Sequence, residues 1–176
     1  MADWRRFAFI GIGPGWVVAI LRLEPLRVEV ANVGFRRWDD QYELGRFVDA
    51  QEPVYEQVCA ELREGRKRSH WMWFIFPQLR GLGQSDLAIK FGISSRQEAE
   101  AYLKHAVLGP RLRECTRLVN LVEGRTVREV FGSPDDLKFR SSMTLFASVA
   151  SENQVFKDAL EKYFAGELDP LTMQRL

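Results

Sequence analysis

The stretch SHWMWFIFPQ, residues 69–78, decides the fold class of this chain. Its aromatic run, residues 71–76, has the local propensity of a buried β-strand. A lone strand would find no partner here, because the segments on both sides have helical patterns, and Ser69 is an acceptable N-cap residue for a helix. We therefore predict a short buried helix in this stretch and an all-α fold for the region that contains it.

Helical signals continue from residue 39 to the end of the chain. Capping boxes predict helix starts at Ser95 with Glu98 and at Thr126 with Glu129. Apolar residues at helical spacing, with proline and glycine at the ends, mark further helices around residues 44–51, 53–65, 110–124, 133–149 and 155–166 and from residue 169 onward. No repeat or linker interrupts this region, so we expect residues 39–176 to form one compact multi-helix bundle.

The composition excludes several classes of protein. The chain has 176 residues, 46% of them hydrophobic, and 25 Lys and Arg against 24 Asp and Glu, which is enough apolar material for a core and too little net charge for a disordered chain. Two cysteines cannot staple a fold of this size, and a four-ligand zinc site would need both of them and both histidines to converge. We predict no metal, no cofactor and a reduced cytoplasmic compartment. A net charge of +1 also argues against nucleic acid as a partner.

Residues 1–38 differ from the rest. Residues 7–21 carry no charge and follow two arginines, as in a signal peptide, but glycines and a proline at 11–15 interrupt them. The run is also too short to span a membrane, which takes about 20 apolar residues, so we expect no membrane segment. Residues 17–33 alternate between apolar and polar, which indicates two short strands broken at Pro25. We expect a short β-like or poorly ordered extension outside the helical fold.

The densest motif spans residues 66–83. It places three cations, a hydroxyl, an imidazole and two indoles beside a glycine turn, and such groups bind anions and stack flat rings. The candidate ligand-binding residues in it are Lys67, Ser69, Trp71, Trp73 and Gln78, and His70 is a candidate catalyst. The alternative is that the aromatic run is core and His70 a hydrogen-bonded core residue.

A second motif spans residues 134–146. If it is one helix, Lys138, Ser141 and Ser142 share a face with Asp135, and this set would suit a phosphate, a ribose or a carboxylate. The alternative is that the acids complement the positive start of a helix, with Lys138 in solvent.

The chain at these motifs resembles a bacterial family, the domain of unknown function numbered eighteen-ten, whose members are often labelled calpastatin. The matching stretches are residues 46–51, 65–83, 102–112 and 132–146, and Ala106 departs from the proline expected there. The resemblance implies a compact, mostly helical domain with no established activity. The calpastatin label does not fit an aromatic-rich, helix-patterned chain, because true calpastatin is a disordered inhibitor. Family members usually begin near Asp39, so residues 1–38 are expected to be an extension, or upstream sequence read from a wrong start codon.

Together the two motifs predict a pocket for a small anionic ligand that carries a ring, such as a nucleotide, an ADP-ribose derivative or a sugar phosphate. If the protein is an enzyme, it hydrolyses a glycosidic or phosphoester bond with His70 or Asp135 as acid or base. A rival hypothesis is a non-catalytic protein-interaction module with an aromatic core and residues 66–68 as a basic docking face. RNA binding through the same basic stretch is a third hypothesis, and the oligomeric state stays open.

Overall fold

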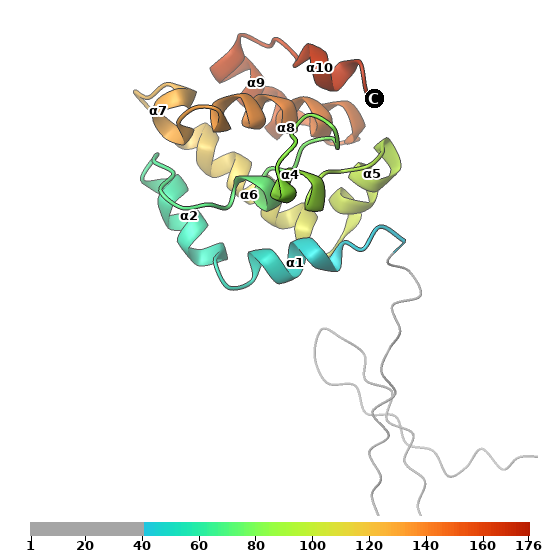
Figure 1. The fold of residues 1–176 in the computed structure, drawn as a ribbon. Helices are drawn as coiled ribbons and strands as arrows, with labels where there is room; N and C mark the ends of the chain where they lie inside the picture. The colour runs from blue at the N-terminus through green and yellow to red at the C-terminus, as the bar shows by residue number, and fades with distance from the viewer. Residues whose placement is uncertain (1–40) are drawn as a thin grey trace, which may run out of the picture. The chain divides into compact units, whose positions relative to one another are not determined.

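The computed structural model describes residues 41–176, and the predictions for residues 1–38 lie outside the described residues. Within the described part the chain forms helices and a single isolated bridge between Leu79 and Ile93, and no strand. The prediction of an all-α fold is confirmed (Figure 1). The helices are α1 (Gly45–Gln51), α2 (Tyr55–Arg63), α3 (Met72–Ile75), α4 (Asp86–Lys90), α5 (Arg96–Lys104), α6 (Leu108–Leu121), α7 (Val127–Phe131), α8 (Asp135–Val149), α9 (Gln154–Phe164) and α10 (Pro170–Met173).

The aromatic run of the deciding stretch is helical, as predicted. It forms the single turn of α3, in which Met72 and Ile75 are buried. The predicted cap is wrong, because Trp71 occupies the N-cap position and makes no capping bond. The hydroxyl of Ser69 donates instead to the carboxylate of Glu61, at 2.6 Å.

The two predicted capping boxes have different outcomes. At α7 both halves are present, with Thr126 and Glu129 each bonded to the backbone of the other. At α5 the hydroxyl of Ser95 accepts from the Glu98 N–H as expected, at 3.2 Å. The carboxylate of Glu98 turns away from the cap, however, and binds Ser94 and Arg46. A partly buried ion pair has therefore taken the place of half of a local capping motif.

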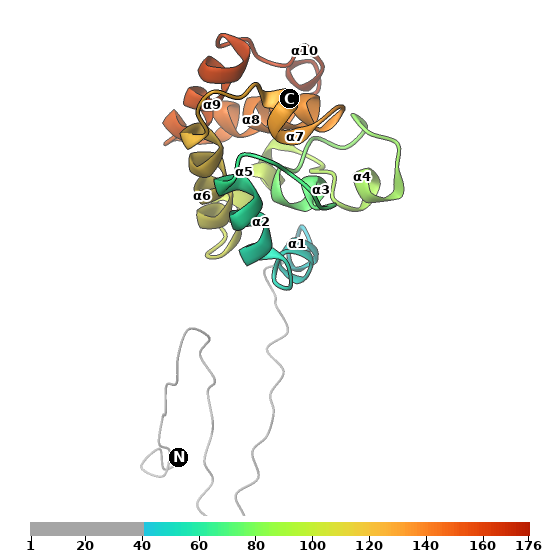
Figure 2. The same ribbon diagram turned by 90° about the vertical axis from the view of Figure 1, so that its left-hand side faces the viewer.

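The helices pack around α6 and α8 (Figures 1 and 2). Helix α8 contacts α5, α7, α9 and α10, and α6 contacts α2, α5 and α9. An aromatic cluster joins the α3 region to α7 and α8. The centre of the Phe139 ring lies 4.9 Å from that of Phe76 and 4.7 Å from that of Phe131. Burial of these rings dominates the apolar core. No helix in residues 41–176 is both long and apolar enough to cross a membrane.

Candidate functional site

Two lysines share one carboxylate at the start of α8. Asp135 and Lys138 lie one turn apart on this helix and form an ion pair of 2.6 Å. Lys67 reaches the other oxygen of Asp135 at 2.8 Å, and its own backbone N–H donates to the carbonyl of Val130 at 2.7 Å. This backbone bond holds the segment before α3 against α7. The cluster of Lys67, Asp135 and Lys138, here called the lysine cluster, therefore joins the two motifs.

The electrostatics of the lysine cluster keep Asp135 ionised. Burial raises the pKa of this carboxyl, but the hydrogen bonds and charges of Lys138 and Lys67 outweigh burial, so the pKa lies below its usual value. An ionised carboxylate at neutral pH is able to accept a proton and is a poor proton donor. Asp135 is therefore unsuited to the role of acid at neutral pH, and its lowered pKa also makes it a weak base.

An indole and a free amide lie beside the lysine cluster. The ammonium of Lys138 is 4.5 Å from the centre of the half-buried Trp73 ring. Lys138, Trp73 and Gln78 line one small cavity of about 10 Å³, room for about one water molecule. The amide of Gln78 makes no hydrogen bond to any residue of the described part, whereas its backbone carbonyl accepts from Ile93. Its donors and acceptor are thus available at this cavity.

The carboxylate of Glu61 organises the segment that leads into α3. Glu61 is buried and accepts from the backbone N–H of Arg68 at 2.8 Å, from the hydroxyl of Ser69 at 2.6 Å and from the indole of Trp71 at 2.8 Å. Burial raises the pKa of Glu61, but these bonds lower it by more, to about 2. The side chains of Ser69 and Trp71 therefore fix the loop that carries Lys67.

Residues 80–92, here called the α4 segment, cover one side of the cavity. The segment is closed at its base by two backbone bonds, from Arg80 to Ile93 at 2.8 Å and from Ile93 to Gln78 at 2.9 Å. Gly83 and Ala88 line the cavity from this side. Helix α4 itself has no buried residue and lies at the outer edge of the domain in Figure 2.

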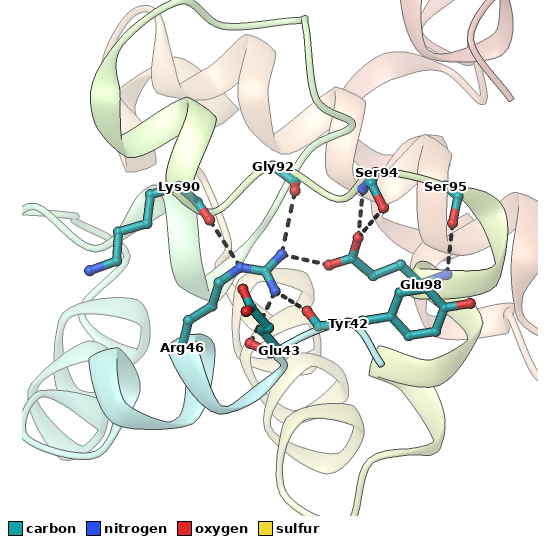
Figure 3. Close-up of polar contacts among 8 residues, drawn as sticks. All are labelled: Tyr42, Glu43, Arg46, Lys90, Gly92, Ser94, Ser95 and Glu98. Carbon is teal, nitrogen blue, oxygen red and sulfur yellow. Dashed lines mark hydrogen bonds and ion pairs between the residues drawn. The ribbon is translucent and has the colours of Figure 1, made fainter. Parts of the chain in front are cut away.

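A partly buried ion pair holds one end of the α4 segment (Figure 3). The guanidinium of Arg46, on α1, donates to the carbonyls of Lys90 at 2.9 Å and Gly92 at 3.5 Å and pairs with Glu98 at 2.5 Å. It also donates to the carbonyls of Tyr42 and Glu43. Glu98 in turn accepts from the backbone and the hydroxyl of Ser94, at 2.7 and 2.6 Å. Arg46 thereby ties α1 to the start of α5 and to the end of the α4 segment.

A family model described as "Protein of unknown function (DUF1810)" matches residues 41–176. The chain belongs to this family. The resemblance predicted from the motifs is thus confirmed. The crystal structure of the conserved hypothetical protein Rv1873 from Mycobacterium tuberculosis is 60% identical in sequence and superposes with a TM-score of 0.77, over 78% of this chain and 98% of Rv1873. The comparison with curated proteins gave no match.

The DUF1810 fold brings five of the predicted site residues together, places Trp71 against one of them and leaves four apart. Those that meet are Lys67, Trp73, Gln78, Asp135 and Lys138. Lys138 is paired and largely enclosed, with 21% of its side chain exposed, so it is not the solvated lysine of the alternative interpretation. Trp71 donates to Glu61, and its ring centre lies 5.3 Å from the ammonium of Lys67. The remaining four are Ser69, which binds Glu61, His70, which is exposed, and Ser141 and Ser142 inside α8.

The two serines of α8 have different surroundings in this DUF1810 domain. The single O–H of Ser141 is shared between the carbonyl of Leu137, at 3.2 Å, and the carboxylate of Asp169, at 3.0 Å, and the second contact anchors α10. Ser142 is fully buried one turn beyond Lys138, and its hydroxyl has no hydrogen-bond partner among the described residues. The two serines therefore do not form one binding face with Lys138: Ser141 anchors α10, and the hydroxyl of Ser142 is unpaired among the described residues.

Sequence reasoning missed the residues that position this DUF1810 site. Glu61 lies beside Leu62 and three positions after Val58 on the buried side of α2, and an acid next to an apolar stripe is the signal that could have singled it out. Arg46 gave no comparable signal, because its partners come from α4 and α5.

Proposed function

We propose that this DUF1810 domain binds a small anionic ligand that carries a ring, such as a nucleotide, an ADP-ribose derivative or a sugar phosphate, at the lysine cluster. The observation that carries the proposal is the free amide of Gln78 beside Lys138 and Trp73. The Gln78 amide is not among the buried, unpaired polar atoms of the described residues, so it reaches water and can exchange that water for a ligand. Next to an ammonium and an indole, it supports recognition of a polar ligand edge.

The charge balance supports an anion. Two lysines face a single carboxylate, so the lysine cluster carries an excess of one positive charge. The side chains of Lys67 and Lys138 are only 10% and 21% exposed, and a charge removed from water interacts more strongly with an incoming anion. Each ammonium also has three donors, of which Asp135 takes one. A phosphate or carboxylate would thus find donors of the right charge.

The ring of the ligand can enter the cavity only if part of the protein moves. A cavity of about 10 Å³ has no room for a base or a sugar. Residues 82–90 of the α4 segment are the part that would move, because α4 buries no residue. Phe91, at the end of the segment, is packed in the core against Phe47 and Phe74 and would stay in place. Displacement of Gly83 and Ala88 would open the face of Trp73 to a ring.

Hydrolysis of the ligand is a further part of this proposal. Asp135 would orient a water molecule and accept its proton as a weak base, because its pKa is lowered, and the lysines would stabilise negative charge on the leaving group. His70 is exposed on the loop before α3 and would act only if the ligand extends to it. The rival interaction module is supported by the exposed side chains of Arg66 and Arg68 on the same loop.

A thermal-shift screen with AMP, ADP, ADP-ribose and glucose 6-phosphate tests the proposal. We expect at least one compound to raise the melting temperature of the full chain, and the shift to disappear in Lys138→Ala and in Gln78→Leu. Lys157→Ala, an exposed lysine on α9, is the matched control and should keep the shift. The proposal is wrong if no compound raises the melting temperature, or if the rise is the same in Lys138→Ala and in the wild type.

A further inference from the structure

A groove crosses the face where α5, α6 and α9 meet, and it shares no residue with the lysine cluster. It consists of two adjoining hollows of about 410 and 420 Å³, and Arg113 and Ser151 line both of them. The end of α5 and the connection from α8 border the first hollow, and α6 and the start of α9 border the second. Because Arg113 lies between the hollows, a ligand that fills both has to be extended and pass over its guanidinium.

The cations of this groove lack acidic partners. Among residues 41–176, Lys104, Arg113 and Arg117 form no ion pair, although all three line the groove. Arg113 makes long hydrogen bonds, of 3.5 and 3.3 Å, to two backbone carbonyls, and its guanidinium lies 6.0 Å from the centre of the buried Phe156 ring. Of the two acids in the lining, Glu100 is paired with Arg96 at 3.4 Å, which leaves Glu152. Three cations therefore face one acid that no ion pair neutralises.

The rest of the lining indicates which kind of anion fits. It is aliphatic, with Leu103 and Val149 in the first hollow and Val155 in the second, and no aromatic side chain lines either hollow. Single-stranded nucleic acid is held by aromatic side chains on which its bases stack. Aliphatic surface between cations instead matches a peptide that alternates acidic and apolar side chains.

We propose that this groove docks an extended acidic segment of a partner protein. Carboxylates of the segment pair with Lys104, Arg113 and Arg117, and its apolar side chains lie against the aliphatic lining. This surface is separate from the ligand site at the lysine cluster, so the two proposals stand or fall independently.

Fluorescence anisotropy with the full chain tests the proposal. The probes are a fluorescein-labelled peptide ELEELE and its neutral counterpart QLQQLQ. We expect the acidic peptide to bind and the neutral one not to, with weaker binding as salt is raised. Arg117→Gln and Lys104→Gln should each weaken binding about fivefold, or about 1 kcal/mol. Both residues are exposed, so these variants keep the fold. Arg113 is not replaced, because it also donates hydrogen bonds to two backbone carbonyls.

The control is Arg128→Gln, an exposed arginine on α7 that lines neither hollow and should leave the affinity unchanged. Absence of binding, equal binding of the two peptides, or equal weakening by Arg128→Gln would overturn the proposal. Tighter binding of an oligothymidylate would show a nucleic-acid surface instead, and displacement of the peptide by equimolar inorganic phosphate would show a small-anion site. Either result also overturns it.

Discussion

The indole N–H of Trp71 donates a 2.8 Å hydrogen bond to the carboxylate of Glu61, ten positions earlier in the chain. The same carboxylate accepts from the backbone of Arg68 and from the side chain of Ser69. Each of these donors belongs to the loop that places Lys67 against Asp135. The geometry of the lysine cluster thus depends on a buried acid that does not itself line the cavity.

Replacement of Glu61 tests that dependence. In Glu61→Gln one oxygen becomes an NH₂ group that faces donors, so buried N–H groups lose their acceptor, and we expect a loss of about 1–3 kcal/mol in the free energy of unfolding. Urea unfolding followed by tryptophan fluorescence measures it. Glu64→Gln, at an exposed acid paired with Arg68, is the control and should cost less than about 1 kcal/mol. Similar losses for the two variants would contradict the role given to Glu61.

The same acid predicts a pH dependence. The pKa of Glu61 is lowered to about 2 in the folded chain, while an unfolded glutamate titrates near about 4.3. A carboxyl whose pKa falls on folding contributes stability above the unfolded pKa, and this contribution is lost as the pH falls toward the folded pKa. Between about pH 5 and pH 2 the wild type should therefore lose more stability than Glu61→Gln, whose amide does not titrate. Parallel curves from urea unfolding over this range would count against the low pKa.

The partly buried pair of Arg46 and Glu98 predicts a larger effect. Arg46→Met leaves Glu98, 3% exposed, without a cation and leaves the carbonyls of Lys90 and Gly92 without a donor. Breaking one partner of a fully buried pair costs about 3–5 kcal/mol, and because 15% of the Arg46 side chain is exposed we expect a loss at the lower end of that range. Arg68→Met, which breaks an exposed pair with Glu64, should cost less than about 1 kcal/mol in the same urea assay. A small loss in Arg46→Met would mean that the α4 segment does not depend on this guanidinium.

Much of the fold, and the central residues of the candidate site, could be predicted because residues close together in the sequence determine them. The caps of α7 and α10, the helical stripes and the helix in the aromatic run follow from neighbouring residues. The partners could not be predicted, because they join distant positions: Glu98 leaves its capping box for Arg46, 52 positions away, and Ser141 binds Asp169, 28 positions away. Spacing places side chains on a face, whereas only tertiary packing shows what covers that face.

Hydrogen exchange should distinguish the α4 segment from the core. Helix α4 has no buried residue, and Leu87 and Ile89 are 40% and 53% exposed, so local opening breaks few contacts. We expect amides of residues 86–90 to exchange well before those of residues 139–147 of α8, which are buried at nearly every position. Mass spectrometry of peptic fragments measures both regions in one experiment. Equal protection would show that the segment opens only with the whole fold, and would remove the route by which a ring could reach Trp73.

The two neighbouring serines of α8 should respond differently to substitution by alanine. Ser141→Ala removes a 3.0 Å bond to Asp169, whose carboxylate also accepts from the N–H and the hydroxyl of Thr172, and we expect a loss of about 1 kcal/mol. Ser142→Ala removes a fully buried hydroxyl that has no partner in the described part, so burying that hydroxyl costs free energy that no hydrogen bond offsets.

We therefore expect Ser142→Ala to be neutral or to raise the melting temperature, while Ser141→Ala lowers it. Alanine favours the helix at both positions, so intrinsic helix propensity adds the same small gain to each variant and cannot produce the difference. Calorimetry of both variants gives the comparison directly. A clear loss of stability in Ser142→Ala would mean that the hydroxyl has a partner, such as an ordered water, one turn below Lys138.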